Sequence, residues 1–95
     1  MAAYLLYQAE VLDPARYEVY KAKAAESIAR AGGRYIIRGG EIDVLEGEPP
    51  VGRTVVLEFP TKQAILDWYR GAEYSEIRKL RDGVARARVI VVDGV

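Results

Sequence analysis

The apolar residues of this chain recur with two alternating periods, and the order of these periods constrains the fold most. Segments with every second residue apolar indicate strands, and segments with apolar residues at spacings of three and four indicate helices. The resulting order is β-α-β-β-α-β, made of two β-α-β halves at residues 3–46 and 52–93. Right-handed crossovers place both helices on one face of a four-stranded antiparallel sheet. The sequence therefore predicts one α+β, ferredoxin-like domain over residues 1–95.

Residues that commonly begin and end helices bound the two helical segments. Asp13 can cap the first helix and Pro14 suits its first position, while Gly32-Gly33 ends it. Thr61 can cap the second helix, which Gly71 interrupts. The expected strands are Ala3 to Val11, Arg34 to Glu46, Thr54 to Phe59 and Arg86 to Asp93.

The strand expected from Arg34 to Glu46 is long, and Gly39-Gly40 predicts a bulge or bend inside it. A turn at residues 47–52 would join it to the next strand. One bulge residue at the glycine pair would bring Arg38 onto the same sheet face as Glu58, roughly 7–8 Å away. We therefore expect an Arg38–Glu58 contact, which is either a structural ion pair or part of a ligand pocket.

The sheet face without helices needs a cover. The first strand offers Tyr4 and Leu6 to that face, or else Leu5 and Tyr7, and the last strand is apolar on both sides from Val89 to Val92. A second protomer that packs sheet to sheet about a two-fold axis is the simplest cover. We expect a homodimeric α/β barrel burying more than about 1,200 Å². A monomer with a solvated sheet face is the alternative.

Composition excludes several classes of function. The chain has 14 basic and 14 acidic residues, which argues against a nucleic-acid-binding protein. It has no cysteine and no histidine, so thiolate nucleophiles and the commonest metal and haem ligands are missing. No apolar run approaches the length of a membrane span, and residues 1–10 do not resemble a signal peptide. We expect a cytoplasmic protein that uses no metal, no cofactor and no membrane.

Two charged residues are candidates for chemistry. Arg38 presents a planar guanidinium that could anchor an anionic ligand or polarise a carbonyl group. Glu58 lies between Leu57 and Phe59 in a predicted central strand, where a partly buried carboxylate could act as a general base. Each also has a structural interpretation: Arg38 as an edge-strand charge with an acidic neighbour, and Glu58 as half of a buried ion pair.

Several aromatic residues could contact a ligand in an apolar pocket. Their hydroxyl and indole groups could orient a bound molecule. The alternative is that they fill the core, because aromatic residues at helical spacing usually do. These candidate ligand-binding residues are Tyr69, Tyr74, Tyr17 and Trp68, and Tyr20 shares the ambiguity.

Short motifs in a fixed order extend from about Ala3 to Val95. They are Asp13-Pro14 with Tyr17 and Tyr20, Gly32-Gly33-Arg34-Tyr35, Arg38-Gly39-Gly40, Leu45-Glu46-Gly47, Arg53, Leu57-Glu58-Phe59-Pro60, Trp68-Tyr69 and Glu73-Tyr74. This ordered set resembles domain-of-unknown-function family 1330. The resemblance implies a dimeric α/β barrel, similar in fold to cofactor-free monooxygenases, muconolactone isomerase-like enzymes and haem-binding chlorite dismutases. It implies no particular reaction.

Three functional hypotheses follow from the sequence. The leading one is a homodimeric barrel with a small-molecule pocket between sheet and helices. The second is a cofactor-free isomerase or monooxygenase-like enzyme acting on a small carbonyl or aromatic metabolite, with Glu58 or a tyrosine as base and Arg38 as its electrostatic partner. The third is a structural dimerisation domain without a ligand.

Overall fold

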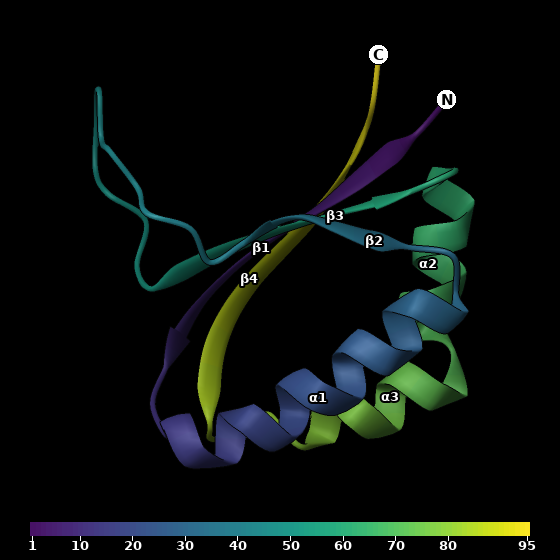
Figure 1. Ribbon diagram of the computed structural model, residues 1–95, viewed down its shortest axis with the longest axis horizontal. Coiled ribbons are helices and arrows are strands. Elements are labelled where there is room, and N and C mark those ends of the chain that lie inside the picture. Colours follow the sequence, from purple (N-terminus) through teal and green to yellow (C-terminus); the bar gives the residue numbers. More distant parts are fainter.

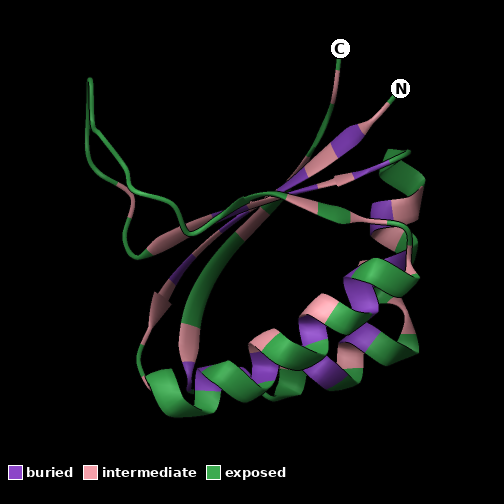
Figure 2. Ribbon diagram, viewed as in Figure 1, coloured by how far each residue is buried: buried purple, intermediate pink, exposed green.

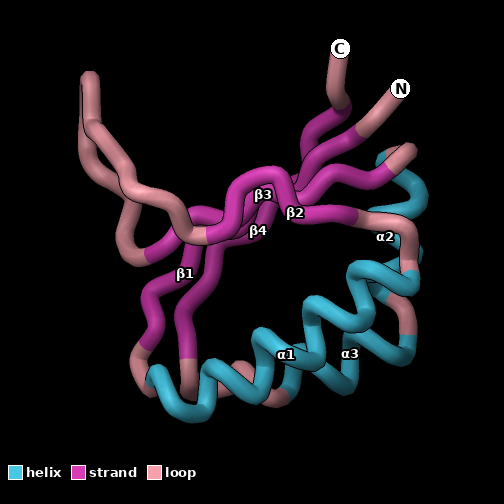
Figure 3. Tube along the Cα trace, in the orientation of Figure 1, coloured by secondary structure: helices cyan, strands magenta, loops and turns pink.

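The computed structural model describes all 95 residues and has the predicted order of elements. Four strands form one antiparallel sheet in the order β2-β3-β1-β4, and three helices lie on one face of it (Figures 1 and 3). Strands β1 and β3 are therefore central, as predicted. The strands are β1 (Ala3–Val11), β2 (Arg34–Arg38), β3 (Arg53–Phe59) and β4 (Ala85–Asp93); the helices are α1 (Pro14–Arg30), α2 (Lys62–Arg70) and α3 (Ala72–Lys79).

Helices α1 and α2 begin at the capping residues that the sequence indicates. The Asp13 carboxylate accepts a hydrogen bond from the Arg16 amide at 3.2 Å, and the Thr61 hydroxyl accepts one from the Ala64 amide at 3.1 Å. Each side chain satisfies an amide that has no partner within its helix. Gly71 has an extended backbone, which separates α2 from α3 and confirms the predicted interruption.

Side chains of the two central strands alternate between the two faces of the sheet. On β1, Leu5, Tyr7 and Ala9 are buried against the helices, whereas Tyr4 and Leu6 face the other side and are half-buried. Buried positions therefore line the space between sheet and helices in Figure 2. Ala3 of β1 also belongs to this core. The rest comes from β3, the helices and the α3–β4 connection: Val55, Leu57, Phe59, Tyr17, Tyr20, Ala24, Ile28, Ile65, Trp68, Tyr74, Ile77 and Val84.

The prediction of a long strand from Arg34 to Glu46 is wrong for its second half, after Arg38. Strand β2 ends at Arg38, and residues 39–52 form a projecting loop with neither helix nor strand (Figure 1). The Gly39 amide still donates to the Thr54 carbonyl of β3 at 2.8 Å, and the left-handed backbone of Gly39, with φ +72°, turns the chain away from the sheet after it. The predicted bulge at Gly39-Gly40 is also wrong, because the register shift lies between Tyr35 and Ile37.

No helix is both long enough and apolar enough to span a membrane.

Candidate functional site

A small cavity of about 40 Å³ lies between the sheet and the helices. Of its 16 lining residues, 13 are hydrophobic, so its interior favours an apolar group. The lining comprises Leu5, Tyr7, Tyr17, Tyr20, Lys21, Ala24, Ile28, Tyr35, Arg38, Arg53, Val55, Leu57, Trp68, Tyr69, Tyr74 and Val89. Five of the sequence-predicted site residues are among these sixteen, and Glu58 is not.

The bulge at Ile36 brings two residues of β2 to the cavity. Tyr35 lies opposite Leu57 and Arg38 lies opposite Val55, and both of these β3 residues face the helices. Without the bulge, residues three apart would lie on opposite faces of the sheet. The Arg38 guanidinium stacks over the Tyr35 ring, with 4.2 Å between its central carbon and the ring centroid.

Arg53 is a cavity residue that was not singled out as a site residue from the sequence. It begins β3 and shares the face of Val55 and Leu57, so period-two alternation could have identified it. Its guanidinium packs against Gly39, where an added Cβ would lie 3.0 Å from Arg53 Nη2. Its Nε is buried and has no hydrogen-bond partner. An unpaired buried donor in a cavity wall can bind an acceptor on a ligand.

Two hydrogen-bonded pairs of tyrosine hydroxyls lie in the interior of the protein. Tyr7 and Tyr17 are hydrogen-bonded at 3.0 Å, and Tyr20 and Tyr74 at 2.5 Å. Burial raises the pKa of Tyr17, Tyr20 and Tyr74 above the usual value for tyrosine. These phenols are therefore neutral near pH 7 and can offer hydrogen bonds, but they are poor bases.

The buried guanidinium of Arg81 lies near the rings of Tyr7 and Tyr20. Arg81 is only 9% exposed, and its central carbon lies 5.3 Å from the Tyr7 ring centroid and 5.5 Å from that of Tyr20. No carboxylate pairs with it, and its Nη1 has no hydrogen-bond partner. The two tyrosine rings contribute favourable cation–π contacts to this charge.

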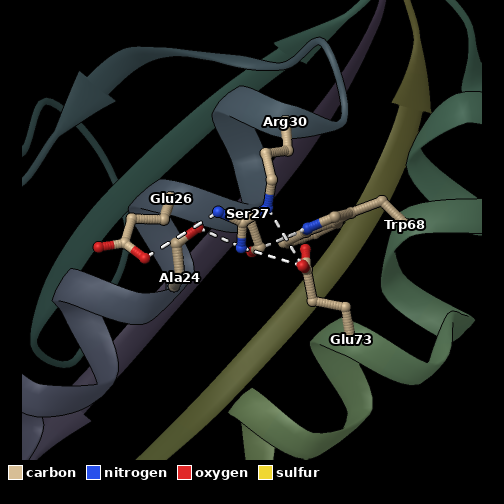
Figure 4. Close-up of polar contacts among 6 residues, drawn as sticks. All are labelled: Ala24, Glu26, Ser27, Arg30, Trp68 and Glu73. Atoms are coloured by element: carbon tan, nitrogen blue, oxygen red, sulfur yellow. Dashed lines mark hydrogen bonds and ion pairs between the residues drawn. The ribbon is translucent and has the colours of Figure 1, made fainter.

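Trp68 is held by a buried hydroxyl on α1. Its Nε1 donates to Ser27 Oγ at 3.1 Å, and Ser27 donates in turn to the Ala24 carbonyl at 2.8 Å (Figure 4). The Trp68 ring packs on Tyr74 with 4.2 Å between centroids. Nearby at the surface, Arg30 pairs with Glu73 at 2.9 Å and ties α1 to α3. These contacts fix the indole in the cavity wall.

Glu58 lies on the other face of the sheet. Arg34 Nε donates to its carboxylate at 2.7 Å, and the Tyr4 hydroxyl donates to it at 3.0 Å. The hydrogen bond from Arg34, followed by that from Tyr4, lowers the pKa of Glu58. Arg38 faces the cavity instead, so the predicted Arg38–Glu58 contact is wrong. The real register pairs Arg34 with Glu58, because the loop to β3 is far longer than the expected turn.

The sequence over residues 2–95 matches the family described as "Domain of unknown function (DUF1330)". The chain belongs to this family. No curated protein matches the sequence of this DUF1330 protein.

Solved structures show the same fold at low sequence identity. RPA0582, a protein of unknown function from Rhodopseudomonas palustris, has a TM-score of 0.77 at 17% identity, over 99% of this chain and 82% of that one. SnoaB, a cofactor-independent oxygenase from Streptomyces nogalater, has a TM-score of 0.65 at 11% identity, over 99% and 93%. An antibiotic biosynthesis monooxygenase has a TM-score of 0.58 at 13% identity, over 100% and 99%. The DUF1330 chain therefore shares its ferredoxin-like fold with these proteins.

The helix-free face of the DUF1330 protomer exposes large apolar side chains. Ile90 and Val92 on β4 are 56% and 45% exposed, and Ile37 on β2 is 45% exposed. At one end of this face, a groove of about 650 Å³ separates the base of the projecting loop from β1 and β4. It is lined by Gln8, Glu10, Glu48, Pro49, Pro50, Val51, Arg86, Ala87 and Arg88. The exposed apolar side chains of this sheet face are typical of a protein–protein contact.

No group of three or more histidine, cysteine, aspartate or glutamate side chains is placed to hold a metal ion.

Proposed function

We propose that this DUF1330 protein binds a small molecule in the cavity between the sheet and the helices. The observation that carries this proposal is the convergence of aromatic and basic side chains on one cavity: Arg38, Tyr17, Trp68, Tyr69 and Tyr74 come from four different elements. An apolar cavity with a few polar groups at its wall is the usual form of a ligand site. A dimerisation domain without a ligand has no need for basic side chains in the wall of an internal cavity.

Trp68 makes the proposal testable without a labelled ligand. It is the only tryptophan and it lines the cavity, so its fluorescence should report occupancy. We expect members of a metabolite panel to change Trp68 emission and to raise the melting temperature together. A ligand at 100 times its dissociation constant stabilises the folded protein by about 2.7 kcal/mol.

A matched pair of variants on α1 separates cavity binding from surface binding. Ala24 is buried in the cavity wall, and Ala22 is exposed on the same helix. Ala24→Val should fill part of the cavity and remove the response, whereas Ala22→Val should preserve it. Circular dichroism checks that both variants are folded. An equal response in both variants, or no response to any compound, would overturn the proposal.

The enzymatic alternative is a cofactor-free isomerase or monooxygenase-like activity, and likeness in fold to SnoaB favours it. Such a reaction needs a base that can reach the substrate. Glu58 lies across the sheet from the cavity with a lowered pKa, and burial raises the pKa of the cavity tyrosines. These observations favour binding over proton abstraction. Oxygen consumption with any compound that binds would reverse this preference.

We also propose that two copies pack through their helix-free faces, with β4 at the centre of the contact. The support is the exposure of Ile90 and Val92 on an edge strand beside β1. Ile90→Glu should convert a dimer to a monomer in sedimentation at micromolar concentration. Val19→Glu is the control, because Val19 is 54% exposed on the opposite side of the protein, on α1. A wild-type monomer would overturn this proposal. A cytoplasmic location stays a prediction.

A further inference from the structure

The charged residues of the cavity all have the same sign. Lys21, Arg38 and Arg53 line it, and no aspartate or glutamate does, although the chain has 14 acidic and 14 basic residues. Lys21 pairs with Glu18 at 2.8 Å. Neither arginine takes part in any ion pair of the structure. The two arginines therefore carry positive charge at the cavity without a counter-ion from the protein.

The two arginines lie close enough to act on one anion. Arg38 is opposite Val55, which is two residues from Arg53 on β3, so the two are diagonal neighbours on the same face. Such neighbours are roughly 7–8 Å apart, within reach of long side chains. Two guanidinium groups without an acidic partner repel each other, and an anion between them would remove that repulsion.

The Arg53 guanidinium has a hydrogen-bond donor that no protein group uses. Its Nε is buried without a partner, and Gly39 leaves room for its guanidinium, since a Cβ there would lie 3.0 Å from Nη2. Stacking on Tyr35 similarly orients the Arg38 guanidinium. A planar guanidinium held in place is suited to paired hydrogen bonds with a carboxylate.

The volume limits the size of the ligand. An apolar cavity of about 150 Å³ holds benzene, whereas this one measures about 40 Å³. Only a chain of a few carbon atoms fits inside. Because 13 of the 16 lining residues are hydrophobic, the buried part should be apolar. Arg38 is exposed and Lys21 and Arg53 are partly exposed, so the charged end of the ligand should lie on the solvent side.

We infer that the ligand is a short-chain monocarboxylate, with its carboxylate between Arg38 and Arg53 and its alkyl chain in the cavity. This inference rests on the proposed small-molecule function. It adds the class of ligand and makes Arg53 a binding residue.

The test compares butyrate with the neutral isostere butyramide and with inorganic phosphate, each titrated at constant ionic strength. Trp68 fluorescence and the melting temperature are the readouts. We expect saturable binding of butyrate, at least about tenfold tighter than that of butyramide or phosphate. Equal binding of butyrate and butyramide would overturn the carboxylate assignment and leave the proposed binding function standing. Binding of phosphate as tight as that of butyrate would overturn it in favour of a general anion site.

Variants assign the binding to the two arginines. Arg53→Met and Arg38→Met should each weaken butyrate binding at least about tenfold and leave butyramide binding unchanged. Arg53→Lys should restore part of the affinity, because it keeps the charge and loses the planar fork. Arg86→Met, on the helix-free face, is the control and should bind like the wild type. Unchanged butyrate binding by folded Arg53→Met and Arg38→Met, or no binding of butyrate to the wild type, would overturn the inference.

Discussion

The two faces of this sheet use the same strands and the same alternation of side chains, but they hold their charges differently. On the helix-free face, Glu58 is paired with Arg34 at 2.7 Å and accepts from Tyr4. On the helix-covered face, Arg38 and Arg53 line a cavity and have no acidic partner. Charges satisfied within the protein are structural, whereas charges left unpaired beside a cavity can bind a ligand. The faces also differ in burial, and the following predictions test both differences.

The largest effect should come from removing an aromatic side chain on the helix-covered face. Trp68→Ala removes a side chain that is 9% exposed, packs on Tyr74 and donates to Ser27. We expect a loss of about 3–5 kcal/mol in the free energy of unfolding, measured by urea denaturation. Ile90→Ala on the other face, measured at a concentration where the protein is monomeric, should cost only about 0.5 kcal/mol. Similar losses in both variants would mean that the faces do not differ in burial.

A smaller effect should come from one hydroxyl of the buried network. Tyr20→Phe leaves the Tyr74 hydroxyl without its partner at 2.5 Å. A buried polar group without a partner costs about 1–3 kcal/mol, which urea denaturation can measure. The double variant Tyr20→Phe with Tyr74→Phe should lose less than the sum of the single losses, because no hydroxyl is then left unpaired. Strict additivity would contradict the hydrogen bond.

The Glu58 cluster should make stability depend on pH in the acid range. Hydrogen bonds from Arg34 and Tyr4 lower the pKa of Glu58 below its ordinary value of 4.5. A carboxyl group with a lowered pKa stabilises the folded state above its unfolded pKa, and this contribution is lost as the pH falls through the folded pKa. Wild type should therefore lose more stability than Glu58→Gln between about pH 6 and pH 3. Glu48→Gln, in the projecting loop, should behave like the wild type.

The smallest effect should be the coupling between Arg38 and Glu58, which lie on opposite faces of the sheet. The stability changes of Arg38→Met and Glu58→Gln should add in the double variant, because neither side chain contacts the other. The Arg34→Met and Glu58→Gln changes should not add, because that pair is in contact at 2.7 Å. If the Arg38→Met and Glu58→Gln changes failed to add while the Arg34→Met and Glu58→Gln changes added, the register expected from the sequence would be correct instead.

The sequence by itself determined the order of elements, the helix caps and the central position of β1 and β3. These depend on local signals: the period of apolar residues, Asp13 and Thr61 as caps, and the interruption at Gly71. It also identified five residues of the cavity wall: four aromatic residues at helical spacing, which usually face the core, and Arg38, which stood out for its charge. The family resemblance was confirmed over residues 2–95.

Only the tertiary structure decided the register of β2 against β3, and with it the composition of the site. A one-residue shift moves every side chain to the other face, and the length of the loop at residues 39–52 cannot be derived from local propensity. The bulge at Ile36 moved Arg38 away from Glu58 and to the cavity beside Arg53. The partner of each charge depends on contacts between distant segments, so the sequence could name the charged residues but could not pair them.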